Sequence, residues 1–319
     1  MTNLPRIAIT MGDPAGIGPE ICMRAASMPE VLEICRPVIY GDIHVLNTTA
    51  QQLGMDLDST CFQETSNSLV PIEIGVVQAI GGLLAAEAIF HAINDAVEGA
   101  VQAVVTAPIN KKALSAAGYS YAGHTELFAD RTGTTSFGMM LVSGTIRVVH
   151  VSTHVSLLEA IRRVKAARVL ECILLAERGC RELGIASPHV AVAGLNPHAG
   201  EDSLFGTEDR DEILPAILRA QETGINVSGP YPPDTVFYRA SQGEFDAVVA
   251  MYHDQGHIPI KLHGFDTGIN ITLGLPIVRV SVDHGTAFDI AGRGIARPNS
   301  MVQAIRTAVD LARARGEKE

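Results

Sequence analysis

The stretch FDAVVAMYHDQGHIPIK, residues 245–261, places an apolar run directly before a segment that holds two histidines, an aspartate and a lysine. The run FDAVVA is nearly continuous in Val and Ala, which is typical of a strand buried on both faces. In open α/β folds, ligands bind at the carboxyl ends of the strands. The stretch therefore predicts a buried strand followed by a functional polar segment.

The same order, an apolar run and then a Gly- or Pro-containing polar loop, recurs along the chain. Further strands are predicted at RIAIT (6–10), RPVIYGD (36–42), AVQAVVTAP (100–108), IRVVHVSTH (146–154), HVAVAGLNP (189–197), INVSGP (225–230) and PIVRVS (276–281). Helical patterns lie between them at 19–28, 77–97, 156–183, 209–223 and 300–315. Alternating strands and helices predict an α/β fold with a mostly parallel sheet covered on both faces.

Composition excludes several classes of protein. The net charge of −11 and the pI near 5.4 argue against a nucleic-acid partner, because phosphate backbones select basic surfaces. The N-terminus lacks a signal peptide and no uncharged apolar segment reaches the ~20 residues that a membrane span needs, so a soluble cytoplasmic protein is expected. The five cysteines form no CxxC pair and are expected to be reduced, mostly buried thiols.

Three histidines each follow a predicted strand: His154, His198 and His253. Neutral imidazoles on rigid strand ends are typical ligands of a catalytic divalent metal that keeps an open position for substrate. Their separations of 44 and 55 residues form no local motif, and a single histidine after a strand is more often a hydrogen-bonded structural residue. The pattern by itself leaves both interpretations open.

A second group of residues suits an anion. Lys261 and Arg279 bracket a segment that contains Asn270, and together these side chains could hold a phosphate or carboxylate. Lys111 and Lys112 form a further pair of cations, although solvated surface lysines are the commoner case.

Common nucleotide and hydrolase fingerprints are not matched. Gly12, Gly16 and Gly18 give G-x3-G-x-G instead of the dinucleotide motif G-x-G-x-x-G, and no Walker lysine follows. These glycines could allow a tight strand-to-helix turn or face an anion at the helix start. No G-x-S-x-G nucleophile elbow exists in the sequence.

Eight motifs in order resemble the 4-hydroxythreonine-4-phosphate dehydrogenase family over nearly the whole chain. They are ITMGDPAGIGPE (9–20), GHTE (123–126), STH (152–154), NPHAGE (196–201), PPDT (232–235), MYHDQG (251–256), GINITLGLP (268–276) and VDHGTAFDIAGRG (282–294). The resemblance implies a two-lobed α/β fold like that of isocitrate and isopropylmalate dehydrogenases. It also implies residues 1–120 with 255–319 as a cofactor-binding lobe, and residues 121–254 as a metal, substrate and dimerisation lobe.

The resemblance assigns roles residue by residue. It implies one divalent metal ion (Zn, Co, Mn, Ni or Mg) at His154, His198 and His253, and NAD at a stretch resembling the adenosine-binding segment of the decarboxylating dehydrogenases. Substrate contacts fall at His124, Thr125, Lys261, Asn270 and Arg279. The cofactor contacts are His284, Gly285, Thr286, Ala287 and Asp289. The implied partner is a second copy of the chain, in a homodimer that shares the active site.

These residues suggest a mechanism as a hypothesis. The metal would lower the pKa of the substrate's secondary hydroxyl while hydride passes to NAD, and the resulting β-keto acid would lose carbon dioxide. Lys261, Asp254 and Asp234 are candidates for proton transfer or for orienting the metal ligands.

The segment HDQGHIPIK is most similar to the branch of the family that oxidises 4-phospho-D-threonate or 4-phospho-D-erythronate to dihydroxyacetone phosphate. His257 could hydrogen-bond the hydroxyl that distinguishes these acids, or it could pack behind the metal ligand without touching substrate. The alternatives are 4-hydroxy-L-threonine 4-phosphate oxidation in vitamin B6 synthesis, oxidation of a cyclic dihydrodiol carboxylate, and a non-catalytic metal-dependent binder of phosphorylated acids.

Overall fold

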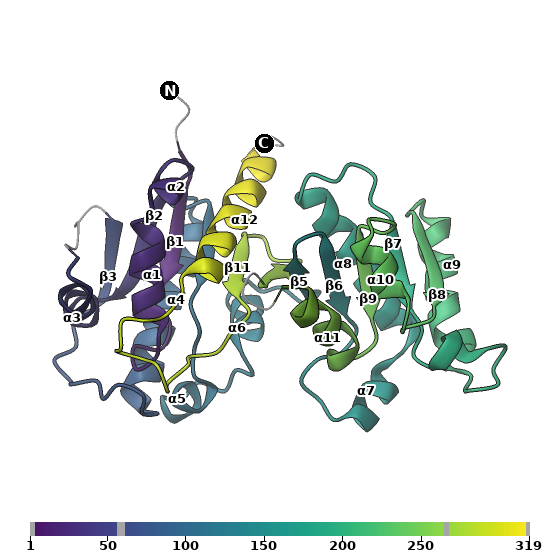
Figure 1. Ribbon diagram of the computed structural model, residues 1–319, viewed down its shortest axis with the longest axis horizontal. Helices are drawn as coiled ribbons and strands as arrows, with labels where there is room; N and C mark the ends of the chain where they lie inside the picture. The colour runs from purple at the N-terminus through teal and green to yellow at the C-terminus, as the bar shows by residue number, and fades with distance from the viewer. Residues whose placement is uncertain (1–3, 56–60, 265–267, 317–319) are drawn as a thin grey trace. The chain divides into compact units, whose positions relative to one another are not determined.

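The computed structural model describes residues 4–55, 61–264 and 268–316, and the chain folds into two compact α/β units (Figure 1). Unit 1 consists of Met1–Thr135 and Leu275–Glu319, and unit 2 of Ser136–Gly274. The chain therefore leaves unit 1 after its first part, builds unit 2, and returns to unit 1 for its last strand and helix.

Unit 1 has a parallel sheet with the strand order β3-β2-β1-β4-β11. Its strands are β1 (Arg6–Thr10), β2 (Arg36–Asp42), β3 (Phe62–Ser66), β4 (Ala103–Thr106) and β11 (Arg279–Val282). All residues of β4 and β11 are buried, as expected for central strands covered on both faces.

Helices cover both faces of this sheet. The helices of unit 1 are α1 (Gly18–Ala26), α2 (Pro29–Leu32), α3 (Ile43–Leu53), α4 (Ala79–Val97), α5 (Lys111–Ala116), α6 (His124–Arg131) and α12 (Asn299–Gly316). Helix α1 contacts α3 and α12, whereas α4 contacts strands β1 to β4 and α5. Local signals explain several helix starts: Pro19 lies in the first turn of α1, and the Asp42 carboxylate accepts from the backbone of His44 and Val45 at the start of α3.

Unit 2 has a mixed sheet in the order β10-β5-β6-β9-β7-β8. Strands β10 (Ile269–Leu273), β5 (Gly138–Ser143) and β6 (Ile146–His150) pair antiparallel. Strands β6, β9 (Ala247–Ala250), β7 (Val190–Ala193) and β8 (Val227–Tyr231) pair parallel. Strand β9 thus lies between β6 and β7, although it comes last of the three in the sequence.

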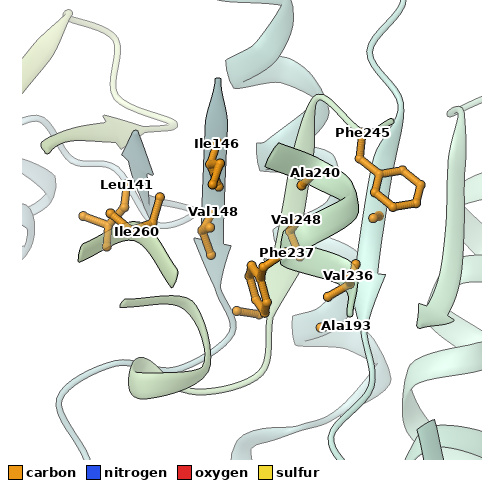
Figure 2. Close-up of a cluster of buried hydrophobic side chains, with 12 residues drawn as sticks. Leu141, Ile146, Val148, Ala193, Val236, Phe237, Ala240, Phe245, Val248 and Ile260 are labelled. Atoms are coloured by element: carbon orange, nitrogen blue, oxygen red, sulfur yellow. The ribbon is translucent and has the colours of Figure 1, made fainter. Parts of the chain in front are cut away.

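The helices of unit 2 pack on this sheet. They are α7 (Leu157–Arg163), α8 (Ala166–Glu182), the 3-10 turn η2 (Pro197–Gly200), the π turn η3 (Asp209–Ile213), α9 (Leu214–Glu222), α10 (Val236–Ser241) and α11 (His253–Gly264). Figure 2 shows part of the core, where Val236 and Phe237 of α10 pack on Val148 and Val248 of the sheet. Ile260 of α11 joins the same cluster, so the sheet positions α11 directly.

All eight strands expected from apolar runs are present, and the predicted α/β class with its mostly parallel sheet is confirmed. Three strands were not predicted: β3, β5 and β10. The helix expected over 156–183 is two helices, because the chain is extended at Val164 and Lys165. The segment after β9, expected to be a loop, is helix α11, which contains Pro259.

Helix α4 is long and apolar enough by composition to cross a bilayer, and it is the one such helix in the described part of the chain. Half of its apolar window is buried in unit 1, where it contacts β1, β2, β3 and β4. Such burial is typical of a core helix in a globular unit.

Helix α4 lies close against α5 at Gly82. A Cβ atom on Gly82 would lie 2.1 Å from the carbonyl oxygen of Ala113, a backbone atom that cannot rotate away. Replacing a glycine inside a helix by alanine ordinarily stabilises a protein by ~1 kcal/mol. We expect Gly82→Ala to lower the free energy of unfolding instead, by about 1–3 kcal/mol, because the two helices must separate.

Chemical denaturation of the purified chain checks this prediction. The matched control is Gly179→Ala in α8, where the new Cβ would meet the movable ends of Leu273 and Met140. We expect the control to lose much less stability. A Gly82→Ala variant as stable as the parent would show that the α4–α5 contact is not close.

Candidate active site

Three neighbouring parallel strands of unit 2 carry the three histidines predicted as metal ligands. His154 follows β6, His253 follows β9 and His198 follows β7. Because carboxyl ends of parallel strands share one edge of a sheet, all three histidines leave the sheet on the same side. The side chain of Gln255 joins two of these ends, accepting from the backbone N–H of Met251 at 2.6 Å and donating to the carbonyl of Gly194 at 2.8 Å.

His253 is the first residue of α11, and its ring is held in one tautomer. Its Nδ1 lies 2.7 Å from the Asp254 carboxylate, which only accepts, so Nδ1 carries a proton, and in the neutral form of the ring Nε2 has the lone pair. This is the arrangement found around metal-binding histidines, where a carboxylate orients the ring. Asp254 therefore has the geometry of the predicted orienting residue.

His154 lies beside His253, with ring centroids 5.7 Å apart. His198 has a different neighbour, Phe205, at 6.2 Å between centroids. It also adopts a left-handed backbone with φ of 54°, in a run that includes Ala199, Glu201 and Asp202. Left-handed backbone is costly for residues other than glycine, so this loop is held by its surroundings. Buried Asp209 holds its start by accepting from the backbone N–H groups of Leu195 and Asn196.

The fit of this site to a divalent metal is partial. Two imidazoles, one with a defined Nε2 lone pair, are a suitable donor pair. Within residues 4–55, 61–264 and 268–316, however, no three His, Cys, Asp or Glu side chains lie close enough together to hold an ion. His154 and His253 are brought together, and His198 does not complete the set in this structure.

Two further histidines extend this group: His257 contacts His253, and His150 contacts His257. The sequence pattern singled out His257 but not His150. His257 stacks on His253 with ring centroids 3.6 Å apart and planes 10° apart. His150, the last residue of β6, lies 4.8 Å from His257 between centroids. His150 was missed because a histidine inside an apolar run carries no local signal. Burial, then the nearby His257, lowers the pKa of His150 well below its ordinary value.

Other predicted residues of unit 2 lie on different elements. Lys261 is exposed on α11, and Asn270 lies on β10 with its Oδ1 buried and without a hydrogen-bond partner among the described residues. An unpaired buried amide oxygen costs free energy, so it suits a position that a ligand completes. Asp234 is exposed just before α10.

Unit 1 holds the remaining predicted substrate contacts. His124 and Thr125 are the first two residues of α6, where backbone N–H groups have no intrahelical acceptor and favour an anion. Arg279 is only 2% exposed at the start of β11, and its Nη2 donates to the Thr106 hydroxyl at 2.7 Å. Its guanidinium also lies 5.5 Å from the centroid of the Phe128 ring, which packs it from one side.

The electrostatics of this part of unit 1 favour a bound anion. Burial lowers the pKa of Arg279 to about 9, with Glu126 acting in the opposite direction. Burial also lowers the pKa of His124 well below its ordinary value, and the charges of Arg279 and Lys111 lower it further. The Nε2 atom of His124 is buried and has no partner among the described residues. An anion would be attracted to the buried guanidinium, and it would accept a hydrogen bond from Nε2 of His124 in the tautomer that carries the proton there.

The stretch predicted to bind the cofactor is anchored in unit 1. The backbone N–H of Ile17 donates to the carbonyl of Thr286 at 3.0 Å, and buried Glu20 accepts from the backbone N–H of Ala296 at 3.0 Å. A cavity of about 230 Å³ opens here, lined in part by Pro14, Gly16, Glu20, Gln52, Gly292 and Arg293. His284, Gly285, Ala287 and Asp289 belong to the same stretch, before the cavity-lining glycines.

The cysteines take no part in these sites. All five are free thiols, and four of them are buried, as expected from the sequence. Burial raises the pKa of Cys35, Cys172 and Cys180 to about 12, so these thiols stay protonated and unreactive at neutral pH.

Comparison with known proteins places these features in a family. The family model of the pyridoxal phosphate biosynthetic protein PdxA matches residues 33–308. The D-threonate 4-phosphate dehydrogenase of Cupriavidus necator is 43% identical, over 97% of this chain and 98% of its own length. A crystal structure of 4-hydroxythreonine-4-phosphate dehydrogenase from Klebsiella pneumoniae is 42% identical, covers 97% of this chain and 99% of its own, and has a TM-score of 0.85.

The chain belongs to the PdxA family, and it is a dehydrogenase acting on a CH–OH group. The resemblance seen in the eight sequence motifs is thereby confirmed. A β-decarboxylating dehydrogenase from Thermococcus kodakarensis shares the fold at 16% identity, with a TM-score of 0.54 over 98% of this chain and 84% of its own. The expected likeness to the fold of the decarboxylating dehydrogenases is confirmed as well.

The buried cation of unit 1 can be tested without substrate. We expect inorganic phosphate to raise the thermal unfolding midpoint by a few degrees, because at one hundred times its Kd an anion contributes about 2.7 kcal/mol. The variant Arg279→Gln should lose this phosphate-dependent shift. The shift is measured for each protein as the difference between its unfolding midpoints with and without phosphate. A substitution that changes the stability of the protein without phosphate therefore does not affect this shift. The control is Arg162→Gln, an exposed arginine on α7; equal shifts in all three proteins would contradict an anion site at Arg279.

Proposed function

We propose that this chain is an NAD-dependent and divalent-metal-dependent dehydrogenase of a 4-phosphorylated four-carbon hydroxy acid, 4-phospho-D-threonate or 4-phospho-D-erythronate. Oxidation of the secondary alcohol is followed by decarboxylation, so the products are dihydroxyacetone phosphate, CO₂ and NADH. The observation that carries the proposal is buried Arg279 close to neutral His124 at the start of α6. This arrangement favours a phosphate group.

The cofactors would supply the bond-making chemistry. A divalent metal ion, when bound, would supply Lewis acidity toward the substrate's oxygen atoms, and NAD would supply the hydride acceptor. His154 and His253 would hold the metal, with His198 as the third ligand from the loop after β7. The cavity at Gly16 and Gly292 would hold the adenosine part of NAD, beside the stretch that begins at His284.

The chain's own side chains would bind the substrate, orient it and transfer protons. Arg279, His124 and Thr125 would hold the phosphate of the substrate, and Lys261 and Asn270 are further proposed substrate contacts. Lys261 is also the candidate for proton transfer. Asp254 holds the proton on Nδ1 of His253, which keeps Nε2 available for a metal, and Asp234 remains a further candidate for proton relay.

The proposed preference for 4-phospho-D-threonate over 4-hydroxythreonine 4-phosphate is supported by one sequence segment and by the name of one relative. The segment HDQGHIPIK is similar to the D-threonate branch, and a relative of that name is 43% identical over nearly the full length. A related crystal structure with a TM-score of 0.85 is named for 4-hydroxythreonine 4-phosphate, so that acid is the second candidate. The two acids differ in having a hydroxyl or an amine at one carbon.

We also propose a homodimer with a shared active site. Helices α7 and α11 expose large apolar side chains that a second copy could cover, with Leu157 and Leu158 each about 60% exposed and Leu262 84% exposed. Lone exposed apolar residues are normal, but several on the helices that follow the histidine-bearing strands favour an interface there.

The proposed function is tested by NAD reduction. The three acids 4-phospho-D-threonate, 4-phospho-D-erythronate and 4-hydroxy-L-threonine 4-phosphate are compared, each with and without a chelator. We expect the highest kcat/KM with one of the first two acids, and loss of activity with the chelator that is restored by added metal. A higher kcat/KM with the amino acid would favour the vitamin B6 activity instead.

A protein that binds a phosphorylated acid but never reduces NAD would support the non-catalytic binder. Equilibrium binding of the same acids distinguishes this case from loss of all binding. Activity without phosphate on the substrate would favour the dihydrodiol carboxylate as substrate, because such an acid does not need a phosphate clamp.

The third metal ligand can be tested separately. His198→Ala should abolish NAD reduction and lower the metal content of the purified protein, because removing one of three ligands weakens the site strongly. The control is His91→Ala, an exposed histidine on α4 of unit 1. Normal metal content and turnover in His198→Ala would refute its role as a ligand.

A further inference from the structure

Arg279 by itself does not balance the charge of a phosphate group in unit 1. A phosphate monoester carries a charge of about −1.5 to −2 at neutral pH. Arg279 supplies one positive charge, whereas burial, and then the charges of Arg279 and Lys111, lower the pKa of His124 well below its ordinary value, so its ring stays neutral. Glu126, in the first turn of α6, adds a negative charge near Arg279. A second cation is needed to balance a bound phosphate.

Lys111 brings a positive charge to the start of α6. It is the first residue of α5, and its side chain is exposed. A Cβ atom built on Gly123, the N-cap residue of α6, would lie 3.9 Å from Cε of Lys111. Because the ammonium nitrogen is bonded to Cε, the charge of Lys111 lies beside the first turn of α6. The effect of Lys111 on the pKa of His124 agrees with this placement.

Three other kinds of donor adjoin this ammonium group. Gly123 has no side chain to cap α6, so the first backbone N–H groups of the helix remain available to an anion. Nε2 of His124 is buried and has no partner within the described part of the chain. The guanidinium of Arg279 is buried and close enough to His124 to lower its pKa. Lys111 thus lies next to a group of donors that already suits an anion.

Nothing within α5 favours a lysine at position 111. The carboxamide of Asn110 caps this helix by accepting from the backbone N–H groups of Lys112 and Ala113 at 2.9 and 3.1 Å. A cation in the first turn of a helix is electrostatically unfavourable, and the first turn of α5 has no acidic residue to offset it. The position of Lys111 is therefore better explained by a ligand than by the stability of α5.

We propose that Lys111 binds the phosphate group of the substrate together with Arg279 and the start of α6, and so helps to select phosphorylated acids. The proposal rests on the proposed function, in which Arg279, His124 and Thr125 hold that phosphate. Lys111 supplies the second positive charge and a charged donor, whereas His124 and the backbone N–H groups supply neutral donors. With two cations the charge of the phosphate is balanced despite Glu126.

The test measures the affinity of the full-length chain for inorganic phosphate by calorimetric titration. Lys111→Met keeps an unbranched apolar side chain but loses the charge, so the Kd for phosphate should rise about 10-fold, as expected when one charge-assisted hydrogen bond is lost. Lys111→Arg keeps the charge and should bind phosphate nearly as well as the parent. The unfolding midpoint of Lys111→Met without phosphate should not fall, because the change removes an unfavourable charge from α5.

The matched control is Lys112→Met. Lys112 has the same charge, is also exposed, and lies about 100° around the axis of α5 from Lys111. We expect Lys112→Met to bind phosphate like the parent, because a general loss of positive charge is not what weakens binding. In NAD reduction, Lys111→Met should raise KM for 4-phospho-D-threonate about 10-fold and leave KM for NAD unchanged.

The outcomes separate this inference from the proposed function. If Lys111→Met binds phosphate like the parent, or if Lys112→Met weakens binding equally, Lys111 is not a phosphate contact and the inference is wrong, while NAD reduction by the parent still supports the function. If phosphate binding depends on Lys111 but no phosphorylated acid reduces NAD, the anion contact is correct and the proposed function fails. If the parent binds no phosphate, the anion site and this inference fail together.

Discussion

The parallel pairing of β9 between β6 and β7 is the constraint on which the candidate site depends. It places the carboxyl ends of three strands next to one another, and buried Gln255 joins two of those ends through the backbone of Met251 and Gly194. Helix α11 can begin only where β9 ends, so the first turn of α11 lies directly over the end of β6. The histidines of both elements meet because of that pairing.

A second constraint concerns charge. Unit 1 buries the guanidinium of Arg279 with a hydroxyl partner at Thr106, close to a neutral His124 at the start of a helix. In unit 2 the ring of His253 lies against those of His154 and His257, and His257 contacts His150; burial lowers the pKa of His150 and of His257. Burying a guanidinium or an imidazole removes it from water, which costs free energy. Such costs are commonly retained at functional sites. The proposed function assigns an anion to the first group of residues and a metal ion to the second.

Much of the fold could be predicted because central strands are nearly continuous in Val, Ile and Ala. The strands that were missed lack that signal: β3 reads FQETS at a sheet edge, and β5 and β10 pair antiparallel with more mixed composition. Helix α11 was missed because Gly256 and Pro259 are poor helix formers, yet packing on β5, β6 and β9 stabilises it. His150 was missed because nothing local distinguishes a buried histidine that packs from one that binds.

The sequence by itself determined the α/β class, the family, and the rule that polar residues follow the strands. Each of these depends on local composition or on motifs that can be read along the chain. Only the tertiary structure decided that β9 lies between β6 and β7, that His253 stacks on His257, and that Arg279 is buried near His124. These depend on hydrogen bonds and packing between residues far apart in sequence, such as Thr106 and Arg279, which no local pattern specifies.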